Sequence, residues 1–380
     1  MHLDAVKEEA RICAACYKMC RHVCTVGTIT CSEADLPNFR AEIAWRAAEN
    51  GAFTPSGVER IYRCCTCGLC QAWCEPGWDV AKITLLARRD IVEMGMAPQA
   101  AVTVNRNVIE ARNPHGQADK MAAVRDVLTD LSAAAETLVF FGCNTLLRQP
   151  EIALAMLKVL RAADIEFTVL TDEPCCGEPQ RLMGFVDDAV ETARATVAAI
   201  ATTGARRVIF TCPSCLRLFS HEYAEWGVLL PEGVELLHVS QFLEELLARD
   251  QRFAGSLTHP FGDAPTRAVY HDPCMLGRCL GEYDAPRRAI TAVPGVELVE
   301  LQHNRERALC CGAGGGLAAT DLRLSIEIGK KVVNLAAEAG AGLLVTACPT
   351  CKQSFARHAG HMDGLGVMDL IELVAAAWPD

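Results

Sequence analysis

Cysteines in this 380-residue chain follow a pattern of five that occurs twice. In the first copy, 31 residues separate Cys143 from Cys175-Cys176-Gly177, and 35 residues separate Cys176 from Cys212-Pro213-Ser214-Cys215. The second copy keeps this order with gaps of 35 and 36 residues, in Cys274, Cys310-Cys311-Gly312 and Cys348-Pro349-Thr350-Cys351. Thiolates bind iron–sulfur clusters, whereas tetrahedral zinc uses four ligands, one fewer than each copy offers. The spacing therefore predicts a repeated domain with an iron–sulfur site in each copy.

Two further cysteine groups lie near the N-terminus, and one has the C-x2-C-x2-C-x3-C spacing of a bacterial-type ferredoxin. In such runs three cysteines bind one [4Fe-4S] cubane and the fourth binds its neighbour. On this rule, the ligands are Cys13, Cys16, Cys20 and Cys74 for one cubane, and Cys64, Cys67, Cys70 and Cys24 for the other. The other group departs from this spacing before Cys20, and Glu75 separates Cys74 from Pro76, so Cys31 and Cys65 are alternative ligands. Otherwise these two and Cys279 are expected to be ordinary small residues.

Composition narrows the class of protein. The chain has 21 cysteines and no signal peptide at its start, which favours a cytoplasmic location and metal binding over disulfides. A net charge of −11 argues against nucleic acid as a partner. No apolar run reaches the roughly 20 residues of a membrane helix, so a direct membrane span is not expected. Flavin and nicotinamide fingerprints are also missing, so the expected partner is a flavoprotein or another redox subunit.

Helices and strands must position these cysteines. Helices are expected at 38–50, ending at Gly51, and at 79–94, capped by Asp79, which makes residues 1–95 an α-helical ferredoxin-like domain. Residues 96–136 lack strong periodicity and are expected to form a linker. Short β-rich runs then alternate with helical patterns through 137–255 and again through 256–380. This alternation predicts two tandem α/β domains with parallel sheets.

Most cysteines of the repeat follow the end of an expected strand, which is the edge where α/β sheets bind ligands. Each C-x-x-C pair opens into a helix, whose N-terminus stabilises thiolates, and Pro213 and Pro349 suit the first helical turn. Gly177 and Gly312 are expected to let the backbone approach a cluster closely. The alternative from another class is a zinc-stabilised scaffold without a redox role.

The doubled pattern resembles the Cys-Cys-Gly domains in the B-type subunit of heterodisulfide reductase. With the ferredoxin-like segment in front, the whole chain is similar to the D-type subunit of the same enzyme. It also resembles the iron–sulfur subunits of glycolate oxidase and anaerobic glycerol-3-phosphate dehydrogenase. The stretches Tyr270–Arg278 and Asn113–Gly116 match stretches of that family. The resemblance implies two cubanes and one or two non-cubane [4Fe-4S] clusters, with the paired sites facing each other to split a disulfide.

Two residues near Cys274 are candidate catalytic residues. His271 could protonate a substrate sulfur, the alternative being a strand-end side chain bonded to backbone. Arg278 could hold an anionic substrate, the alternative being a surface role.

The predicted function is an oxidoreductase subunit that acts only with partners. Electrons would pass through the cubanes to non-cubane clusters that reduce a disulfide or a similar acceptor. The alternative redox role is a wiring subunit between a flavin dehydrogenase and quinone, peripheral to the membrane through a quinone-reactive partner.

Overall fold

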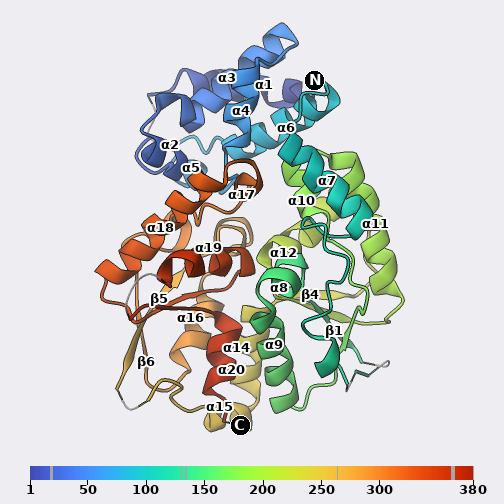
Figure 1. The fold of residues 1–380 in the computed structure, drawn as a ribbon, viewed down its shortest axis with the longest axis vertical. Helices are drawn as coiled ribbons and strands as arrows, with labels where there is room; N and C mark the ends of the chain where they lie inside the picture. The colour runs from blue at the N-terminus through green and yellow to red at the C-terminus, as the bar shows by residue number, and fades with distance from the viewer. Residues whose placement is uncertain (18–19, 130, 133–134, 263, 361–363, 380) are drawn as a thin grey trace.

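The computed structural model describes residues 1–17, 20–129, 131–132, 135–262, 264–360 and 364–379. Figure 1 shows a helical N-terminal module lying across one end of two α/β halves, with the C-terminus at the opposite end. The module contains the elements η1 (His2–Val6), α1 (Lys7–Ala14), α2 (Thr25–Thr30), η2 (Glu33–Asp35), α3 (Pro37–Asn50), α4 (Pro55–Tyr62), α5 (Leu69–Ala72) and α6 (Val80–Glu93).

Helices α3 and α6 confirm both helices predicted in the N-terminal region. Helix α3 ends at Gly51, whose φ of 68° lies in the left-handed region that glycine adopts without strain. Helix α6 begins after Asp79, whose carboxylate accepts a hydrogen bond of 2.9 Å from the Lys82 amide. Their buried faces meet in a small apolar core that includes Ala44 and Ile83. This core also contains Ala101 and Met183, so it joins the module to the segments that follow it in the chain.

The expected linker is partly helical, which corrects the prediction for residues 96–136. Helix α7 (Gln99–Ala111) and the short turn η3 (Arg125–Val127) lie within it. Helix α7 buries Ala101, Val104 and Val108, and on the same helix Asn105 donates a 2.6 Å hydrogen bond to Asp188. A buried asparagine interrupts the apolar face of this short helix, so its periodicity is weak in the sequence.

Two four-stranded parallel sheets confirm the predicted α/β halves. The first has the order β2-β1-β3-β4, and the second has the equivalent order β6-β5-β7-β8. Their strands are β1 (Thr137–Phe140), β2 (Thr168–Val169), β3 (Arg207–Phe210), β4 (Glu235–His238), β5 (Thr266–His271), β6 (Val296–Val299), β7 (Leu343–Thr346) and β8 (Gly366–Asp369). Both halves therefore bring their cysteine-bearing loops to the carboxyl edge of a sheet.

Helices connect these strands and cover both sheets. The first half covers residues 137–255, and its last helix extends one residue further. It contains α8 (Cys143–Arg148), α9 (Pro150–Ala162), α10 (Glu178–Met183), α11 (Val186–Ala201), α12 (Pro213–Ser220), α13 (Glu222–Glu225), α14 (Val239–Arg249) and α15 (Gln251–Ser256). The second half, residues 256–380, contains η4 (Met275–Cys279), α16 (Asp284–Thr291), η5 (Arg305–Arg307), α17 (Leu317–Thr320), α18 (Leu322–Glu338), α19 (Pro349–Ala359) and α20 (Leu370–Ala377).

The two halves share one hydrophobic core. Helix α9 of the first half packs against α20 of the second, and α14 packs against α16 (Figure 1). Buried residues from both sheets, among them Val139, Ile209, Ala268 and Val345, belong to the same cluster. A shared, closely packed core fixes the relative position of the two sheets and hence of their cysteine loops.

Candidate metal centres

The first five-cysteine set (Cys143, Cys175, Cys176, Cys212, Cys215) is buried at the carboxyl edge of the first sheet. The sulfur atoms of Cys176 and Cys215 lie 3.3 Å apart, and the Cys143 and Cys175 thiols are in hydrogen-bonding contact. Contacts with Cys175 and Cys215 lower the pKa of Cys176 to about 6. The structure therefore brings together the five side chains predicted from spacing.

The second five-cysteine set (Cys274, Cys310, Cys311, Cys348, Cys351) repeats this arrangement. Contacts with Cys310 and Cys351 lower the pKa of Cys311 well below its ordinary value. Burial and the neighbouring Cys310 raise the pKa of Cys274. All of these residues are buried except Cys274, which is partly exposed.

The two five-cysteine sets touch each other. Cys212 of the first set is in hydrogen-bonding contact with both Cys215 and Cys348, and these contacts lower its pKa well below the ordinary value. Cys348 in turn contacts Cys351 within the second set. Because both C-x-x-C turns open helices, α12 and α19 direct the positive ends of their dipoles toward this meeting point. Pro213 and Pro349 occupy the first turn of these helices, as predicted.

The N-terminal cysteines lie in two groups, and the predicted division of ligands between two cubanes stays a prediction. In the distal set (Cys13, Cys16, Cys20, Cys74), burial and then the charges of Cys20, Cys16 and Cys74 raise the pKa of Cys13 to about 12. In the proximal set (Cys24, Cys64, Cys67, Cys70), the four side chains line one small cavity together with Cys65. Burial raises the pKa of Cys24 against the opposing charge of Arg40, whose guanidinium lies 3.9 Å from its sulfur. Cys31 is exposed and belongs to neither set.

The proximal set adjoins the second five-cysteine set. Contact with Cys310 and burial raise the pKa of Cys67 well above its ordinary value, and Cys65 contacts the same Cys310. Arg88 is fully buried and fixes this junction, because it donates hydrogen bonds to the carbonyl oxygens of Cys64 at 2.7 Å and Gly315 at 2.6 Å. The four sets therefore form a continuous row from the N-terminal module to the first α/β half.

The residues present fit iron–sulfur clusters. None of the 21 cysteines, all of which lie in the described part of the chain, is in a disulfide. Backbone amides point at the sulfurs, with Gly177 N 3.5 Å from Cys175 Sγ and Gly312 N 3.3 Å from Cys310 Sγ. Buried thiolate sets with such amide donors are typical of iron–sulfur ligation.

Gly177 and Gly312 are required for a backbone reason that the sequence did not suggest. Both have positive φ, 93° and 84°. A Cβ on Gly312 would lie 2.5 Å from the Ser325 carbonyl oxygen, and one on Gly177 would lie 3.0 Å from that of Ala189. The close approach in the structure is to a neighbouring helix, and the predicted approach to a cluster stays a prediction.

His271 and Arg278, the predicted catalytic residues, are both engaged by the protein. His271 is buried, donates from Nε2 to the Leu309 carbonyl oxygen at 3.0 Å, and has its pKa lowered to about 4 by burial. Arg278 donates to the carbonyl oxygens of Cys67 and Ala308, both at 2.7 Å. These contacts agree with the strand-end alternative for His271 and give Arg278 a role at the junction between the N-terminal module and the second half.

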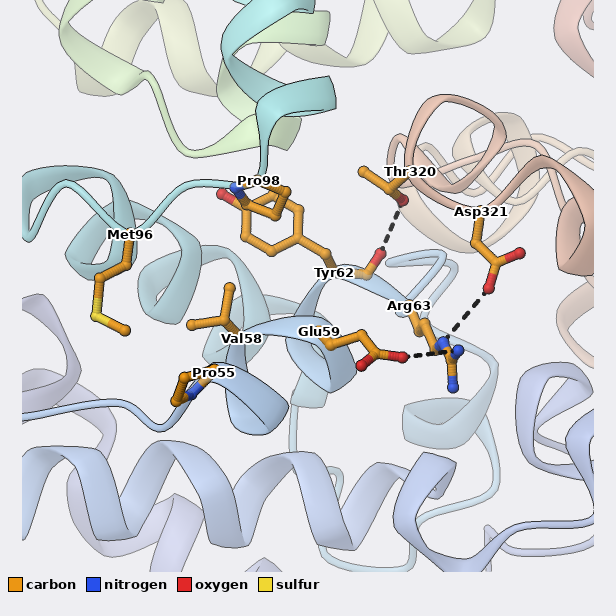
Figure 2. A pocket seen from close by; sticks show the side chains of 9 residues that line it. All are labelled: Pro55, Val58, Glu59, Tyr62, Arg63, Met96, Pro98, Thr320 and Asp321. Carbon is orange, nitrogen blue, oxygen red and sulfur yellow. Dashed lines mark hydrogen bonds and ion pairs between the residues drawn. The ribbon is translucent and has the colours of Figure 1, made fainter.

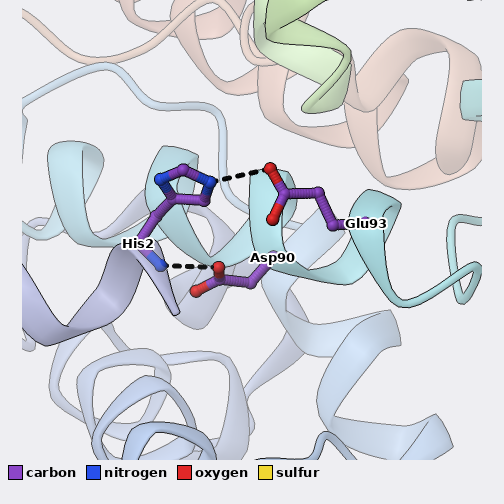
Figure 3. A group of neighbouring side chains, drawn as sticks. All are labelled: His2, Asp90 and Glu93. Atoms are coloured by element: carbon purple, nitrogen blue, oxygen red, sulfur yellow. Dashed lines mark hydrogen bonds and ion pairs between the residues drawn. The ribbon is translucent and has the colours of Figure 1, made fainter.

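Two other features lie away from the cysteine sets. Figure 2 shows a cavity of about 540 Å³ between α4 and the second half, where Arg63 forms ion pairs with Glu59 at 2.8 Å and Asp321 at 3.4 Å. Figure 3 shows His2 beside Asp90 and Glu93. The carboxylate of Asp90 accepts the backbone N–H groups of both His2 and Leu3, so this group ties the N-terminus to α6. Neither feature reaches the row of sulfurs.

Sequence reasoning missed a polar chain between the two halves. His115 Nε2 lies 2.8 Å from Asn144 Oδ1, and Asn144 Nδ2 donates to Thr350 Oγ1 at 2.6 Å. Asn144 directly follows Cys143, and Thr350 lies inside the second C-x-x-C turn. His115 lies in the stretch Asn113–Gly116, which matches the resembled family but for which no role was predicted.

Comparisons with known proteins agree with this geometry. The cysteine-rich domain family CCG matches twice, over residues 137–220 and 268–356. The D-type subunit of dihydromethanophenazine:CoB--CoM heterodisulfide reductase from Methanosarcina barkeri is 34% identical over 339 residues, covering 85% of this chain and 80% of that protein. EtfAB:quinone oxidoreductase from Syntrophomonas wolfei is 28% identical, covering 68% of this chain and 37% of that protein.

A solved structure of a hypothetical protein from Helicobacter pylori has a similar fold. Its TM-score is 0.60 at 10% identity, covering 91% of this chain and 68% of that chain. Among the residues described, no helix of this chain is both long and apolar enough to cross a membrane.

Proposed function

Because this chain belongs to the family of the D-type subunit of heterodisulfide reductase, with two CCG cysteine-rich domains, we propose that it is an iron–sulfur electron-transfer subunit that reduces a disulfide. In this proposal the distal and proximal N-terminal sets each hold a [4Fe-4S] cubane. The two five-cysteine sets each hold a non-cubane [4Fe-4S] cluster. The acceptor disulfide is reduced where the five-cysteine sets meet.

The observation that carries the proposal is the continuous row of four sulfur sets. Cys20 of the distal set lies beside Cys24 of the proximal set, Cys67 contacts Cys310, and Cys348 contacts Cys212. A row of neighbouring sites suits electron transfer, whereas a zinc scaffold needs no such proximity between one site and the next. Electrons would pass along this row between the N-terminal module and the first α/β half, in either direction.

When bound, the clusters supply one-electron carriers whose potentials depend on burial and hydrogen bonds. The chain contributes the surroundings. The buried cysteines of the two five-cysteine sets exclude water, and amide groups such as that of Gly312 hydrogen-bond to sulfur. The N-termini of α12 and α19 stabilise negative charge where the five-cysteine sets meet.

Disulfide reduction is favoured over wiring because both five-cysteine sets are complete. An electron relay requires a bound cluster only, and a fifth cysteine offers it no evident benefit. A substrate disulfide bound where the two complete sets meet would have one cluster site next to each of its sulfur atoms. The half-exposed Ser214 and Thr350 at this meeting point support access from solvent.

Partner subunits would supply the donor, and a flavoprotein is the proposed class. The alternative is a wiring subunit that passes electrons from a flavin dehydrogenase to quinone. One observation favours it, namely the similarity to a relative named EtfAB:quinone oxidoreductase. In either case we propose a cytoplasmic protein, brought to a membrane by its partner where quinone is involved.

Metal analysis of anaerobically purified protein tests the proposal. Four [4Fe-4S] clusters correspond to about 16 iron atoms per chain. A brown protein with about this iron content and little zinc is the expected result. Zinc with little iron would overturn the redox role, and about eight iron atoms would restrict the proposal to two of the four sites.

A further inference from the structure

We propose that Cys65 is a sixth cysteine of the second α/β site, supplied by the N-terminal module. Its thiol donates a hydrogen bond to Cys310 and raises the reduction potential of the cluster at that site. This inference rests on the proposed function, because it requires clusters to bind. It also separates Cys65 from the proximal N-terminal set, where its neighbours Cys64 and Cys67 belong.

The Cys65 side chain is directed into the second half. It is 3% exposed, packs in one buried cluster with Cys310, and its sulfur lies 4.0 Å from the carbonyl oxygen of Gly312. Its apolar neighbours include Leu317, Leu324 and Ile328, all from the second half. Cys65 also lines the cavity of the proximal set, so it lies between two candidate cluster sites.

Backbone packing fixes this position. A Cβ on Gly315 would lie 2.5 Å from both the Cys64 carbonyl oxygen and the Cys65 carbonyl carbon. Only a residue without a side chain allows these two loops to approach so closely. Arg88 then joins the same loops through its hydrogen bonds to Cys64 and Gly315. The thiol of Cys65 is therefore held against Cys310 by contacts that involve neither the Cys65 nor the Cys310 side chain.

Hydrogen bonds to cluster sulfurs are one of the levers that set a cluster's potential, because they stabilise its more negative, reduced form. The S–H group of a cysteine that does not bind iron can donate such a hydrogen bond. In the first half, the equivalent Cys175 packs in a buried cluster with Cys143 and Val108, whereas Cys310 packs in a cluster with Cys65. The two α/β sites therefore differ, and the difference comes from the N-terminal module.

The test compares Cys65→Ala and Cys65→Ser with a matched control, Cys31→Ala, in the full chain prepared anaerobically. Cys31 is exposed and lies outside every set. Iron content is measured first, and electron paramagnetic resonance then follows each cluster during a redox titration. The signal of the second site is identified as the one altered by Cys311→Ala.

The expected result is an unchanged iron content and unchanged cubane signals in all three variants. The potential of the second-site signal falls in Cys65→Ala and returns toward its original value in Cys65→Ser, whose hydroxyl also donates a hydrogen bond. Loss of the proximal cubane signal in Cys65→Ala would make Cys65 a cubane ligand and overturn the inference. So would an unchanged potential, which would leave Cys65 a packing residue. An unmodified chain without iron would instead overturn the proposed function itself.

Discussion

Asn144 Nδ2 donates a hydrogen bond of 2.6 Å to Thr350 Oγ1, joining the loop after Cys143 to the C-x-x-C turn of the other half. The amide oxygen of Asn144 can only accept, so the 2.8 Å contact with His115 places a proton on His115 Nε2. His115 Nδ1 then accepts from Arg148, 3.3 Å away. Four residues thus form one directed chain of donors that connects the linker to both cluster sites.

Removing this contact should destabilise the protein moderately. We expect Asn144→Ala and Thr350→Val each to lower the free energy of unfolding by about 1–2 kcal/mol, because a partly buried hydrogen bond is lost. The double variant should cost little more than the larger single one, since both changes remove the same bond. Urea unfolding under anaerobic conditions measures this. Thr350→Ser keeps the hydroxyl and is the control, and strictly additive losses would contradict a direct coupling.

Arg88 should be among the most sensitive residues outside the cysteines. It is fully buried and donates to the carbonyl oxygens of Leu182, Gly315 and Cys64 at 2.6–2.7 Å, one in each of the three parts of the molecule. We expect Arg88→Met to cost about 3 kcal/mol or more, because it leaves buried carbonyl groups without donors.

The neighbouring Arg89 is the matched control for this prediction. Its ion pairs with Glu93 and Asp187 are exposed, so Arg89→Met should cost less than about 1 kcal/mol. Thermal unfolding of the two variants, followed together with the signal of the proximal cubane, checks both values. Equal losses for the two variants would mean that the junction does not depend on Arg88.

The two Cys-Cys-Gly glycines should differ in their tolerance of alanine. In Gly312→Ala the new Cβ would lie 2.5 Å from the Ser325 carbonyl oxygen and 2.8 Å from Ile328 Cβ, so helix α18 must move. In Gly177→Ala the nearest atom would be 3.0 Å away. Gly51→Ala, with positive φ and open space, should cost only the left-handed backbone strain of about 1 kcal/mol. In urea unfolding, the loss in free energy of unfolding should therefore be largest for Gly312→Ala, smaller for Gly177→Ala and smallest for Gly51→Ala. A reversed order would contradict the steric argument.

Local patterns in the sequence predicted most of the fold. The short β-rich runs became strands such as β1 and β5, because their hydrophobic residues are contiguous. The five-cysteine sets were predictable for a similar reason, since most of their members follow a strand end and parallel strands end at one edge. Helix α7 was missed because its buried Asn105 obscures the apolar face.

Contacts between distant segments could not be predicted from local patterns. Arg278 donates a hydrogen bond to the carbonyl oxygen of Cys67, 211 positions away in the sequence. This contact places the side chain at the junction between the N-terminal module and the second half. Cys65 is similar, because spacing alone describes it as a spare ligand of the ferredoxin run. Its true neighbour, Cys310, is supplied by the docking of the second half.

The second cysteine of each Cys-Cys pair separates disulfide chemistry from wiring. Cys176 contacts Cys175 and Cys215, and Cys311 contacts Cys310 and Cys351, so each lies at the centre of its set. Replacing either with alanine leaves four cysteines, which can still hold a simpler cluster. We expect Cys176→Ala and Cys311→Ala to keep the reduction of both cubanes by an artificial donor. Turnover of the acceptor with the native partner should fall by about 100-fold or more.

The measurement pairs electron paramagnetic resonance of the reduced cubanes with acceptor reduction in the assembled complex. Cys279→Ala is the matched control, because Cys279 is a partly exposed cysteine outside both sets and its loss should leave turnover unchanged. If only one of the two variants loses turnover, the disulfide is reduced at that site alone and the other site is a relay. Normal turnover in both variants, with altered cluster signals, would reject disulfide reduction. The fifth cysteines would then be structural, and transfer from a flavin dehydrogenase to quinone would be the better account of the row.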